Sequence, residues 1–193
     1  MSEEDMDWTE PEVLGLLVDD MARIYANETD NVAADNLVSG ATQTTSFTSP
    51  MTDPANWAAW MYDAASSILS GSNGNLPTHL FLSPDQWSAL GKLSDTADRP
   101  LFPQVGPMNA SGTLAPTAFG GTAFGLQIVV DKNLVLPGGN NLYVGRSDGF
   151  EIYEQPKGAI SVEAADGSLS RFIKFRGYFA TLMLDATKFV EPV

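Results

Sequence analysis

A long helical pattern near the N-terminus constrains the fold more than any other feature of this sequence. Apolar residues recur at three-and-four spacing from Leu14 to Leu37, and Gly40 is a natural helix end. Thr9 and Glu12 have the spacing of a capping box at the other end. These signals predict a helix of about 28 residues, about 42 Å long. In a chain of 193 residues, which builds one domain or two small lobes, such a helix must span the molecule or project from it.

The same periodicity assigns the apolar face of this helix and predicts two shorter helices. The long helix presents Leu14, Leu17, Val18, Met21, Ile24 and Tyr25. Asp53-Pro54 begins a second helix, which ends at residues 71–74. Its apolar face, whose two tryptophans we expect in the core, contains Trp57, Trp60, Met61, Ala64, Ile68 and Leu69. Ser83-Pro84-Asp85-Gln86 begins a third helix, which runs to about Lys92.

Most of the remaining chain predicts strands. Runs of β-prone residues, several of them bounded by Pro-Gly-Gly or Asp-Gly turns, cover residues 41–50, 78–82, 126–131, 142–146, 150–154, 159–164 and 171–184. Residues 94–122 instead have many Pro, Gly, Ser and Thr and little periodicity. A segment of that length without regular structure is usually a functional or interaction loop.

The charge is strongly negative and unevenly distributed. The chain has 24 acidic and 10 basic residues, a balance of −14, which disfavours electrostatic binding to nucleic acid or to an anionic membrane. Acidic residues dominate residues 1–30, whereas the last quarter carries Lys157, Arg171, Lys174, Arg176 and Lys188. The two ends can pair within a chain or between chains, or the acidic helix simply faces water. There is no apolar run of transmembrane length and no signal sequence at the start, so a cytosolic origin is the default.

The sequence gives little support for catalysis. Cysteine is absent, and the one histidine, His79, lies in a short apolar strand where a structural role is expected. There is neither a Gly-x-Ser-x-Gly nucleophile motif nor a phosphate-binding loop. We therefore expect no enzyme, no cofactor and no metal. Two other functions stay open: a hydrolase using paired carboxylates, and an acidic, β-rich binding module using the loop at 94–122.

The order of these elements resembles a known family. Asp7-Trp8-Thr9-Glu10-Pro11 leads into the long acidic helix, and Ser83-Pro84-Asp85-Gln86-Trp87-Ser88-Ala89-Leu90 follows the helix with paired tryptophans. A loop with Pro100-Leu101-Phe102-Pro103, a strand from Phe124 to Asp131 and the long strands of residues 171–190 complete the order. Over residues 7–190 it is similar to the major capsid proteins of tailed bacteriophages of the Hong Kong 97 type. No single motif carries the resemblance; the order does.

The resemblance implies an α+β fold with two lobes. A peripheral lobe, residues 1–45 and 152–178, would hold a long spine helix and an antiparallel sheet. An axial lobe, residues 46–151 and 179–193, would hold a mixed sheet flanked by helices. The implied function is a structural subunit of an icosahedral capsid, assembled into pentamers and hexamers in the bacterial cytoplasm and enclosing double-stranded DNA. Implied partners are further copies of the chain and scaffolding, portal or decoration proteins, with non-specific contact to packaged DNA and none with a membrane.

The resemblance also implies where subunits meet. The tip near Asp166 would reach three-fold contacts, and the loop near Phe102 would lie near the five-fold and six-fold axes. The charges independently suit pairing between neighbours, with acids on the helix facing basic residues on the late strands. The proposed interface residues are Asp19, Asp20, Glu28, Arg171, Lys174, Arg176, Asp166 and Phe102.

The chain departs from the family pattern at its start. Family members normally carry an N-terminal arm and an extended loop before the spine helix, and this sequence begins almost at the helix. We therefore expect a truncated form, and no lysine–asparagine cross-link, because the extended loop that carries the lysine is absent and residues 163–169 contain no asparagine. The alternative within the fold is a shell protein of an encapsulin-type nanocompartment.

Overall fold

The computed structural model describes residues 12–102, 120–136, 139, 141–163 and 171–193. The chain divides into two compact units. One, called here the helix–ribbon unit, comprises Met1–Ala33 and Ile152–Thr181; the other, the sheet unit, comprises Ala34–Glu151 and Leu182–Val193. Their junctions follow residues 33, 151 and 181, whereas the lobes expected from the sequence have junctions after 45, 151 and 178. The assignment of peripheral and axial roles to these units stays a prediction.

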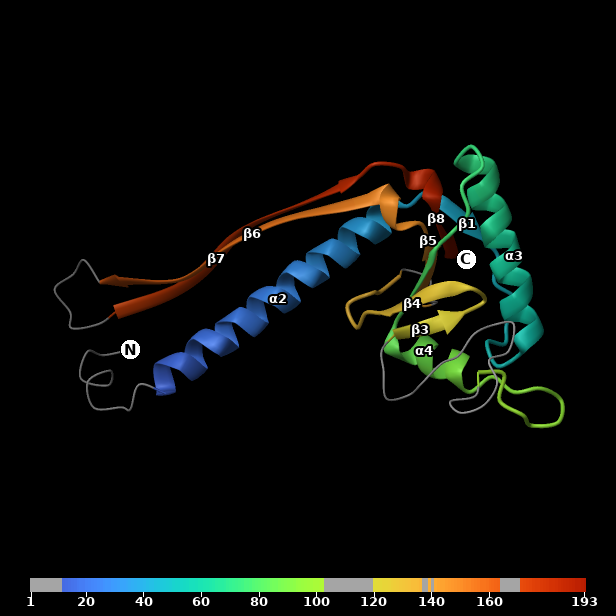
Figure 1. Ribbon diagram of the computed structural model, residues 1–193, viewed down its shortest axis with the longest axis horizontal. Helices are drawn as coiled ribbons and strands as arrows, with labels where there is room; N and C mark the ends of the chain where they lie inside the picture. The colour runs from blue at the N-terminus through green and yellow to red at the C-terminus, as the bar shows by residue number, and fades with distance from the viewer. Residues whose placement is uncertain (1–11, 103–119, 137–138, 140, 164–170) are drawn as a thin grey trace. The chain divides into compact units, whose positions relative to one another are not determined.

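The helix–ribbon unit is built from one long helix and two long strands. Helix α2 runs from Glu12 to Gly40, which confirms the long helix predicted from periodicity. Strands β6 (Phe150–Glu163) and β7 (Arg171–Met183) form a two-stranded sheet, called here the ribbon. Within this unit α2 runs beside the ribbon (Figure 1), and Tyr25 of α2 contacts Phe175 of β7. The expected capping residue Thr9 and the tip at Asp166 lie outside the described residues.

Two expectations about this unit were wrong. The sequence predicts separate strands at 150–154 and 159–164, but β6 continues through Pro156 and Gly158. A proline is tolerated because β6 lies at the edge of its sheet, where a missing N–H costs no ladder bond, and Gly158 adopts a φ of 78° that other residues rarely take. Ile24 was predicted on the apolar face, yet 56% of its surface is exposed.

The sheet unit begins with two helices whose starts match their sequence signals. Helix α3 spans Pro54–Gly71, and the carboxylate of Asp53 accepts a hydrogen bond from the N–H of Ala55 at 2.9 Å. Helix α4 spans Pro84–Gly91, and the hydroxyl of Ser83 accepts from the N–H of Gln86 at 3.4 Å. Both caps satisfy amide groups that the first helical turn leaves without partners. The two predicted helix starts are confirmed.

Six short strands form a mixed sheet in this unit. Its order is β1-β8-β5-β2-β4-β3, with β1 parallel to β8 and β2 parallel to β4, and the other neighbours antiparallel. The strands are β1 Gln43–Thr45, β2 His79–Leu82, β3 Gly120–Ala123, β4 Leu126–Val130, β5 Leu142–Gly145 and β8 Phe189–Pro192. Two 3-10 turns, Ser147–Gly149 and Ala186–Lys188, lie beside them.

The core lies on both faces of this sheet. Alternate residues of one strand point to opposite faces, so Val144 joins the cluster under α3 while Tyr143 joins a second cluster. The second cluster, which includes the last turns of α2, contains Leu37, Leu134, Leu136, Tyr143 and Phe189. On α3 the buried residues are Trp57, Trp60, Met61, Ala64 and Ile68, which confirms the tryptophans as core. Leu69, predicted on the same face, is 44% exposed instead.

Candidate subunit interface

One face of the ribbon is covered by the chain's own helix. A two-stranded sheet alone is marginally stable in water, so it needs a partner surface. The rings of Tyr25 and Phe175 lie 5.2 Å apart between centroids, tilted by 51°. Gly177 also faces Tyr25, since a Cβ built there would collide with the tyrosine hydroxyl. These residues define the inner face of the ribbon.

Packing on the ribbon changes the acid–base chemistry of Tyr25. The loss of water around the hydroxyl raises the pKa of Tyr25, and the nearby negative charge of Glu154 raises it further. Both effects disfavour the phenolate. Tyr25 therefore keeps its proton at neutral pH and serves as an uncharged packing residue between helix and ribbon.

The outer face of the ribbon combines positive charge with aromatic surface. Along β7 the exposed residues alternate with half-buried ones, as a strand covered on one side requires. Lys174, Arg176 and Tyr178 are exposed, and 68% of the Tyr178 surface is accessible. The ammonium group of Lys157 on β6 lies 5.6 Å from the centroid of the Tyr178 ring, within cation–π range.

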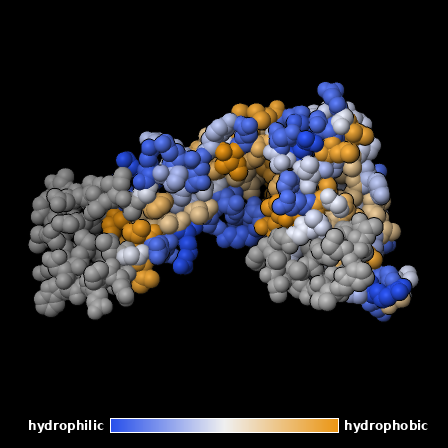
Figure 2. Space-filling model, in the orientation of Figure 1, coloured by the Kyte–Doolittle hydropathy of each residue, from blue (hydrophilic) through white to orange (hydrophobic). Residues whose placement is uncertain are grey.

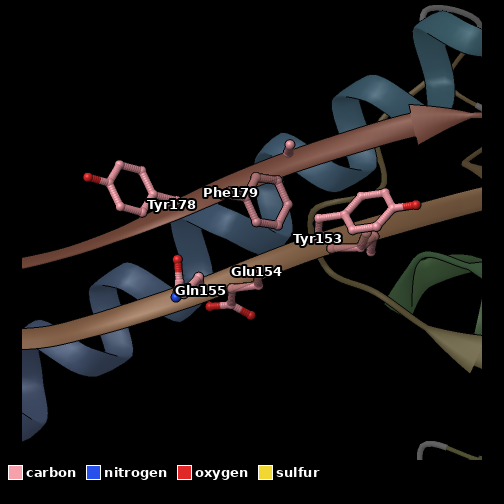
Figure 3. Close-up of a pocket in the computed structure, with 7 residues that line it drawn as sticks. Tyr153, Glu154, Gln155, Tyr178 and Phe179 are labelled. Atoms are coloured by element: carbon pink, nitrogen blue, oxygen red, sulfur yellow. The ribbon is translucent and has the colours of Figure 1, made fainter.

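A shallow depression crosses the two strands at this point. Its volume is about 400 Å³, and it is lined by Ile152, Tyr153, Glu154, Gln155, Tyr178, Phe179 and Ala180. Figure 3 shows Tyr178 and Phe179 extending from β7, and Tyr153, Glu154 and Gln155 from β6. Small-molecule sites bury most of their ligand in a cleft. This open surface suits a broad partner better than a small ligand.

Helix α2 exposes an acidic surface with apolar residues set into it. Asp19, Asp20 and Glu28 are exposed, and no ion pair joins them to another residue in the part of the chain that the structure describes. Leu16 and Ile24 are exposed on the same helix. In the view of Figure 2, hydrophobic and hydrophilic patches lie next to one another on the molecular surface.

The structure describes six of the eight predicted interface side chains. Asp19, Asp20 and Glu28 share α2, and Lys174 and Arg176 share the outer face of β7. The last is Phe102, which is only 3% exposed and packs edge-on against Phe124 at 5.8 Å. The Phe102 ring belongs to the core of the sheet unit, so we exclude Phe102 from the proposed interface.

Two of the predicted positions are not described. The side chain of Arg171 and the whole of Asp166 lie outside the described residues. Sequence reasoning also missed Lys157, Tyr153 and Tyr178 as members of the outer face. The alternation of Lys174, Arg176 and Tyr178 along β7 was the available signal for Tyr178.

The polar groups of the sheet unit have structural roles. Arg146 donates from Nε to both carboxylate oxygens of Asp148 at 3.0 Å, and the ammonium group of Lys188 lies 3.3 Å from the same carboxylate. These partners hold the pKa of Asp148 below its usual range, chiefly through the bond from Arg146. His79 lies 2.7 Å from the hydroxyl of Thr78 through Nδ1.

The described residues contain neither a metal-binding cluster nor a membrane-spanning helix. Among them, no group of three or more His, Asp or Glu side chains is arranged to hold a metal ion. Within the same residues, no helix is both long enough and apolar enough to cross a bilayer. What the helix–ribbon unit offers is instead two exposed surfaces of opposite charge.

Comparisons with known proteins bear on the family and on the fold of the chain. The phage capsid protein family matches residues 1–191. No curated protein matches the sequence. A solved structure from Gordonia phage Cozz has a TM-score of 0.68 at 16% identity, and one from Mycobacterium phage Che8 has 0.67 at 18%. Each match covers 98% of this chain and 66% of the other, so the chain spans about two thirds of their length.

A third solved structure, a virus-like particle from Pyrococcus furiosus, matches less closely. Its TM-score is 0.51 at 13% identity, over 86% of this chain and 62% of that one. The fold is thus the α+β, Hong Kong 97-type capsid fold that the order of elements predicted. Since its family match extends over nearly the whole sequence, this chain belongs to the phage capsid protein family.

Proposed function

We propose that this protein is a structural subunit of a phage or prophage capsid, and that copies of it assemble into a closed shell around double-stranded DNA. The observation that carries the proposal is the family match over residues 1–191. The geometry supports it, because the helix–ribbon unit exposes an acidic surface on α2 and a basic, aromatic surface on β7. Surfaces of opposite charge on one chain favour contact between identical copies.

The contacts between copies combine several weak charge pairs. Asp19, Asp20 and Glu28 of one copy face Lys174 and Arg176 of the next, with Arg171 extending the basic surface. An exposed ion pair contributes only about 0–1 kcal/mol. Repeated around pentamers and hexamers, such pairs set register and the choice of partner more than total stability.

The role is structural rather than catalytic. The depression on the ribbon is open, and among the described residues no cluster of acids or histidine is arranged for a metal ion. A panel of glycosides assayed across pH tests the remaining alternative, a hydrolase with two carboxylates. Turnover that disappears when one exposed acid is replaced would contradict a purely structural role.

The site of action is the virion capsid, with assembly in the cytoplasm of the bacterial host. Scaffolding, portal or decoration proteins are its further partners, and packaged DNA touches it without sequence preference. The net charge of −14 supports weak rather than tight contact with DNA.

A nanocompartment shell protein is the second candidate. The fold similarity to the virus-like particle from Pyrococcus furiosus favours it, although the TM-scores with the two phage structures are higher. Cargo distinguishes the two functions: a nanocompartment co-purifies with an enclosed enzyme, whereas a capsid assembled in infected cells encloses DNA.

Light scattering over a concentration series, with negative-stain imaging of the same fractions, tests the proposal. The chain is measured as it stands and with any upstream coding sequence restored. We expect rings of five or six subunits, or closed shells. The proposal would be contradicted if the chain remained a monomer of 20.7 kDa at every concentration and the extended chain also remained monomeric.

A further inference from the structure

We infer that the outer face of the ribbon around Tyr178 receives helix α2 of a second copy, with Ile24 of that helix lying against the tyrosine. This inference rests on the proposed function, because it names the contact through which copies associate. The inference depends on two surfaces of the helix–ribbon unit. The receiving face comprises Tyr153, Lys157, Lys174, Arg176 and Tyr178; the helix stripe comprises Leu17, Asp20, Ile24 and Glu28.

The helix stripe is a continuous exposed surface on one side of α2. Its members follow one another at spacings of three, four and four residues, so they align along the helix axis. Ile24 is 56% and Leu17 38% exposed, and both acids are exposed as well. Tyr25, the next residue, points about 100° away around the helix toward the ribbon of its own chain. Ile24 lies between the two carboxylates and Leu17 lies one turn before Asp20, so the stripe combines apolar and acidic surface on one side of the helix.

The receiving face offers matching chemistry. Lys174 and Arg176 supply positive charge at one end, and Lys157 supplies it at the other, where it lies over the Tyr178 ring. Beside these cations lie the exposed rings of Tyr178 and Tyr153. The depression of about 400 Å³ lies next to them, and its lining includes the aromatic rings of Tyr153, Tyr178 and Phe179 together with one carboxylate, that of Glu154. An aliphatic side chain can occupy such a depression while charged groups pair at its rim.

The spacing of charges agrees between the two surfaces. Asp20 and Glu28 are eight residues apart, which is about 12 Å along a helix. Lys174 and Tyr178 are four residues apart, which is about 13 Å along a strand. One carboxylate can therefore reach the pair Lys174 and Arg176 while the other reaches Lys157. Ile24, midway between the carboxylates, then lies over the aromatic surface.

The occupant must be a second copy rather than the chain's own helix. Tyr25 and Phe175 hold that helix against the inner face of the ribbon, and one helix cannot cover both faces. The contact joins two different surfaces, so each copy donates its helix to one neighbour and receives a helix from another. Such heterologous contacts close into rings when the rotation between neighbours permits.

Charge reversal in matched pairs of variants tests this contact. One variant carries Asp20→Lys and Glu28→Lys, a second carries Lys157→Glu and Lys174→Glu, and a third carries all four changes. Sedimentation or light scattering measures self-association of the full chain. We expect each double variant to associate at least about tenfold more weakly than the native chain, which corresponds to about 1.4 kcal/mol. The fourfold variant should recover to within about threefold of the native chain.

Truncation of the central contact tests its apolar part separately. Ile24→Ala and Tyr178→Ala should each weaken association by about tenfold, because the middle of an interface carries most of its binding energy. The double variant should weaken association by less than the product of the two single effects, as expected for side chains in contact. Full additivity would place the two residues in different contacts and overturn the inference.

Matched controls exclude general effects of charge and folding. Asp63→Lys with Lys132→Glu reverses one acid and one base on exposed positions of the sheet unit and should leave association unchanged. Circular dichroism and thermal melts establish that each variant folds. If a reversal variant unfolds, the neutral changes Asp20→Asn with Glu28→Gln, and Lys157→Met with Lys174→Met, take its place.

The outcomes separate this inference from the proposed function. If the native chain associates and the folded double variants associate equally well, the inference is overturned and the capsid role stands. The inference is also overturned, and the capsid role again stands, if the folded fourfold variant associates no better than either double. If the native chain is monomeric at every concentration, with upstream sequence restored, both are overturned.

Discussion

The hydroxyl of Tyr25 occupies the space that a side chain at Gly177 would fill. A Cβ built on Gly177 lies 2.7 Å from the Cζ atom of Tyr25 and 3.2 Å from the carbonyl oxygen of Gln155. Helix and ribbon therefore approach closely at this point because residue 177 has no side chain. Because the helix packs on this inner face, the alternate residues Lys174, Arg176 and Tyr178 remain exposed on the outer face.

Gly177→Ala should consequently destabilise the protein. The added methyl group forces Tyr25 away from the ribbon, and overpacking of this kind costs about 1–3 kcal/mol. Chemical unfolding monitored by circular dichroism measures the change. Gly15→Ala is the control: it lies on an exposed part of α2 with nothing within 4 Å of a built Cβ, so it should stabilise slightly. Equal stability of the Gly177→Ala and native chains would refute the close approach.

Tyr143→Phe should weaken the sheet unit. The Tyr143 ring is fully buried, and its hydroxyl lies 2.8 Å from Oε2 of Glu191 and 3.2 Å from the carbonyl oxygen of Val38. Burial, together with Glu191, raises the pKa of Tyr143, so the hydroxyl remains a donor. Its loss leaves two half-buried acceptors without this donor, and we expect a cost of about 1 kcal/mol, as for the loss of a typical hydrogen bond. Tyr62→Phe, on a residue that is 79% exposed, should cost far less in the same denaturation experiment.

Asp148 should make stability depend on acid pH. Its folded pKa is depressed below the ordinary 3.8 by the Arg146 guanidinium and by Lys188. A depressed carboxyl pKa stabilises the fold above the ordinary value, and that contribution is lost as pH falls through the lower folded value. The unfolding free energy is measured from pH 5 downward, a starting point about one unit above the ordinary carboxyl pKa. We expect it to decline as the pH falls. The decline should be shallower for Asp148→Asn than for the native chain. Identical slopes for the native and Asp148→Asn chains would argue against the ion pairs.

Association between copies should weaken as salt concentration rises. Exposed charges more than about 10 Å apart are already screened at 0.1 M salt, and close exposed pairs weaken further at about 1 M. Light scattering at increasing sodium chloride concentration should therefore show smaller assemblies for the native chain. A variant with Lys174→Gln and Arg176→Gln should show a smaller dependence on salt. Assembly that strengthens with salt in both chains would indicate a contact dominated by apolar surface instead.

Several elements could be predicted because their causes are local. Asp53 and Ser83 cap their helices through side-chain bonds that reach only two or three residues along the chain. The length of α2 follows from a periodicity that continues to Leu37 and ends at Gly40. The order of these local elements also indicated the capsid fold, and the similarity to the two phage structures confirms it.

Other features could not be predicted because they depend on residues far apart in the sequence. Ile24 fits the apolar periodicity of α2, yet it is exposed because the ribbon covers only the side of the helix that carries Tyr25. Phe102 lies in a proline-rich segment, and its place in the core, where it packs against Phe124, depends on residues distant in the sequence. The continuity of β6 through Pro156 likewise depends on that strand lying at a sheet edge.

The amino-acid sequence by itself determined the length of α2, the places where α3 and α4 begin, and the excess of acid near one end and of base near the other. Tertiary structure alone decided which of these charged and apolar residues share a surface. Local hydrogen bonds and side-chain periodicity act over a few residues and can be read along the chain. The outer face that joins Lys157 to Tyr178 exists only because two strands, 21 residues apart at that point, lie side by side.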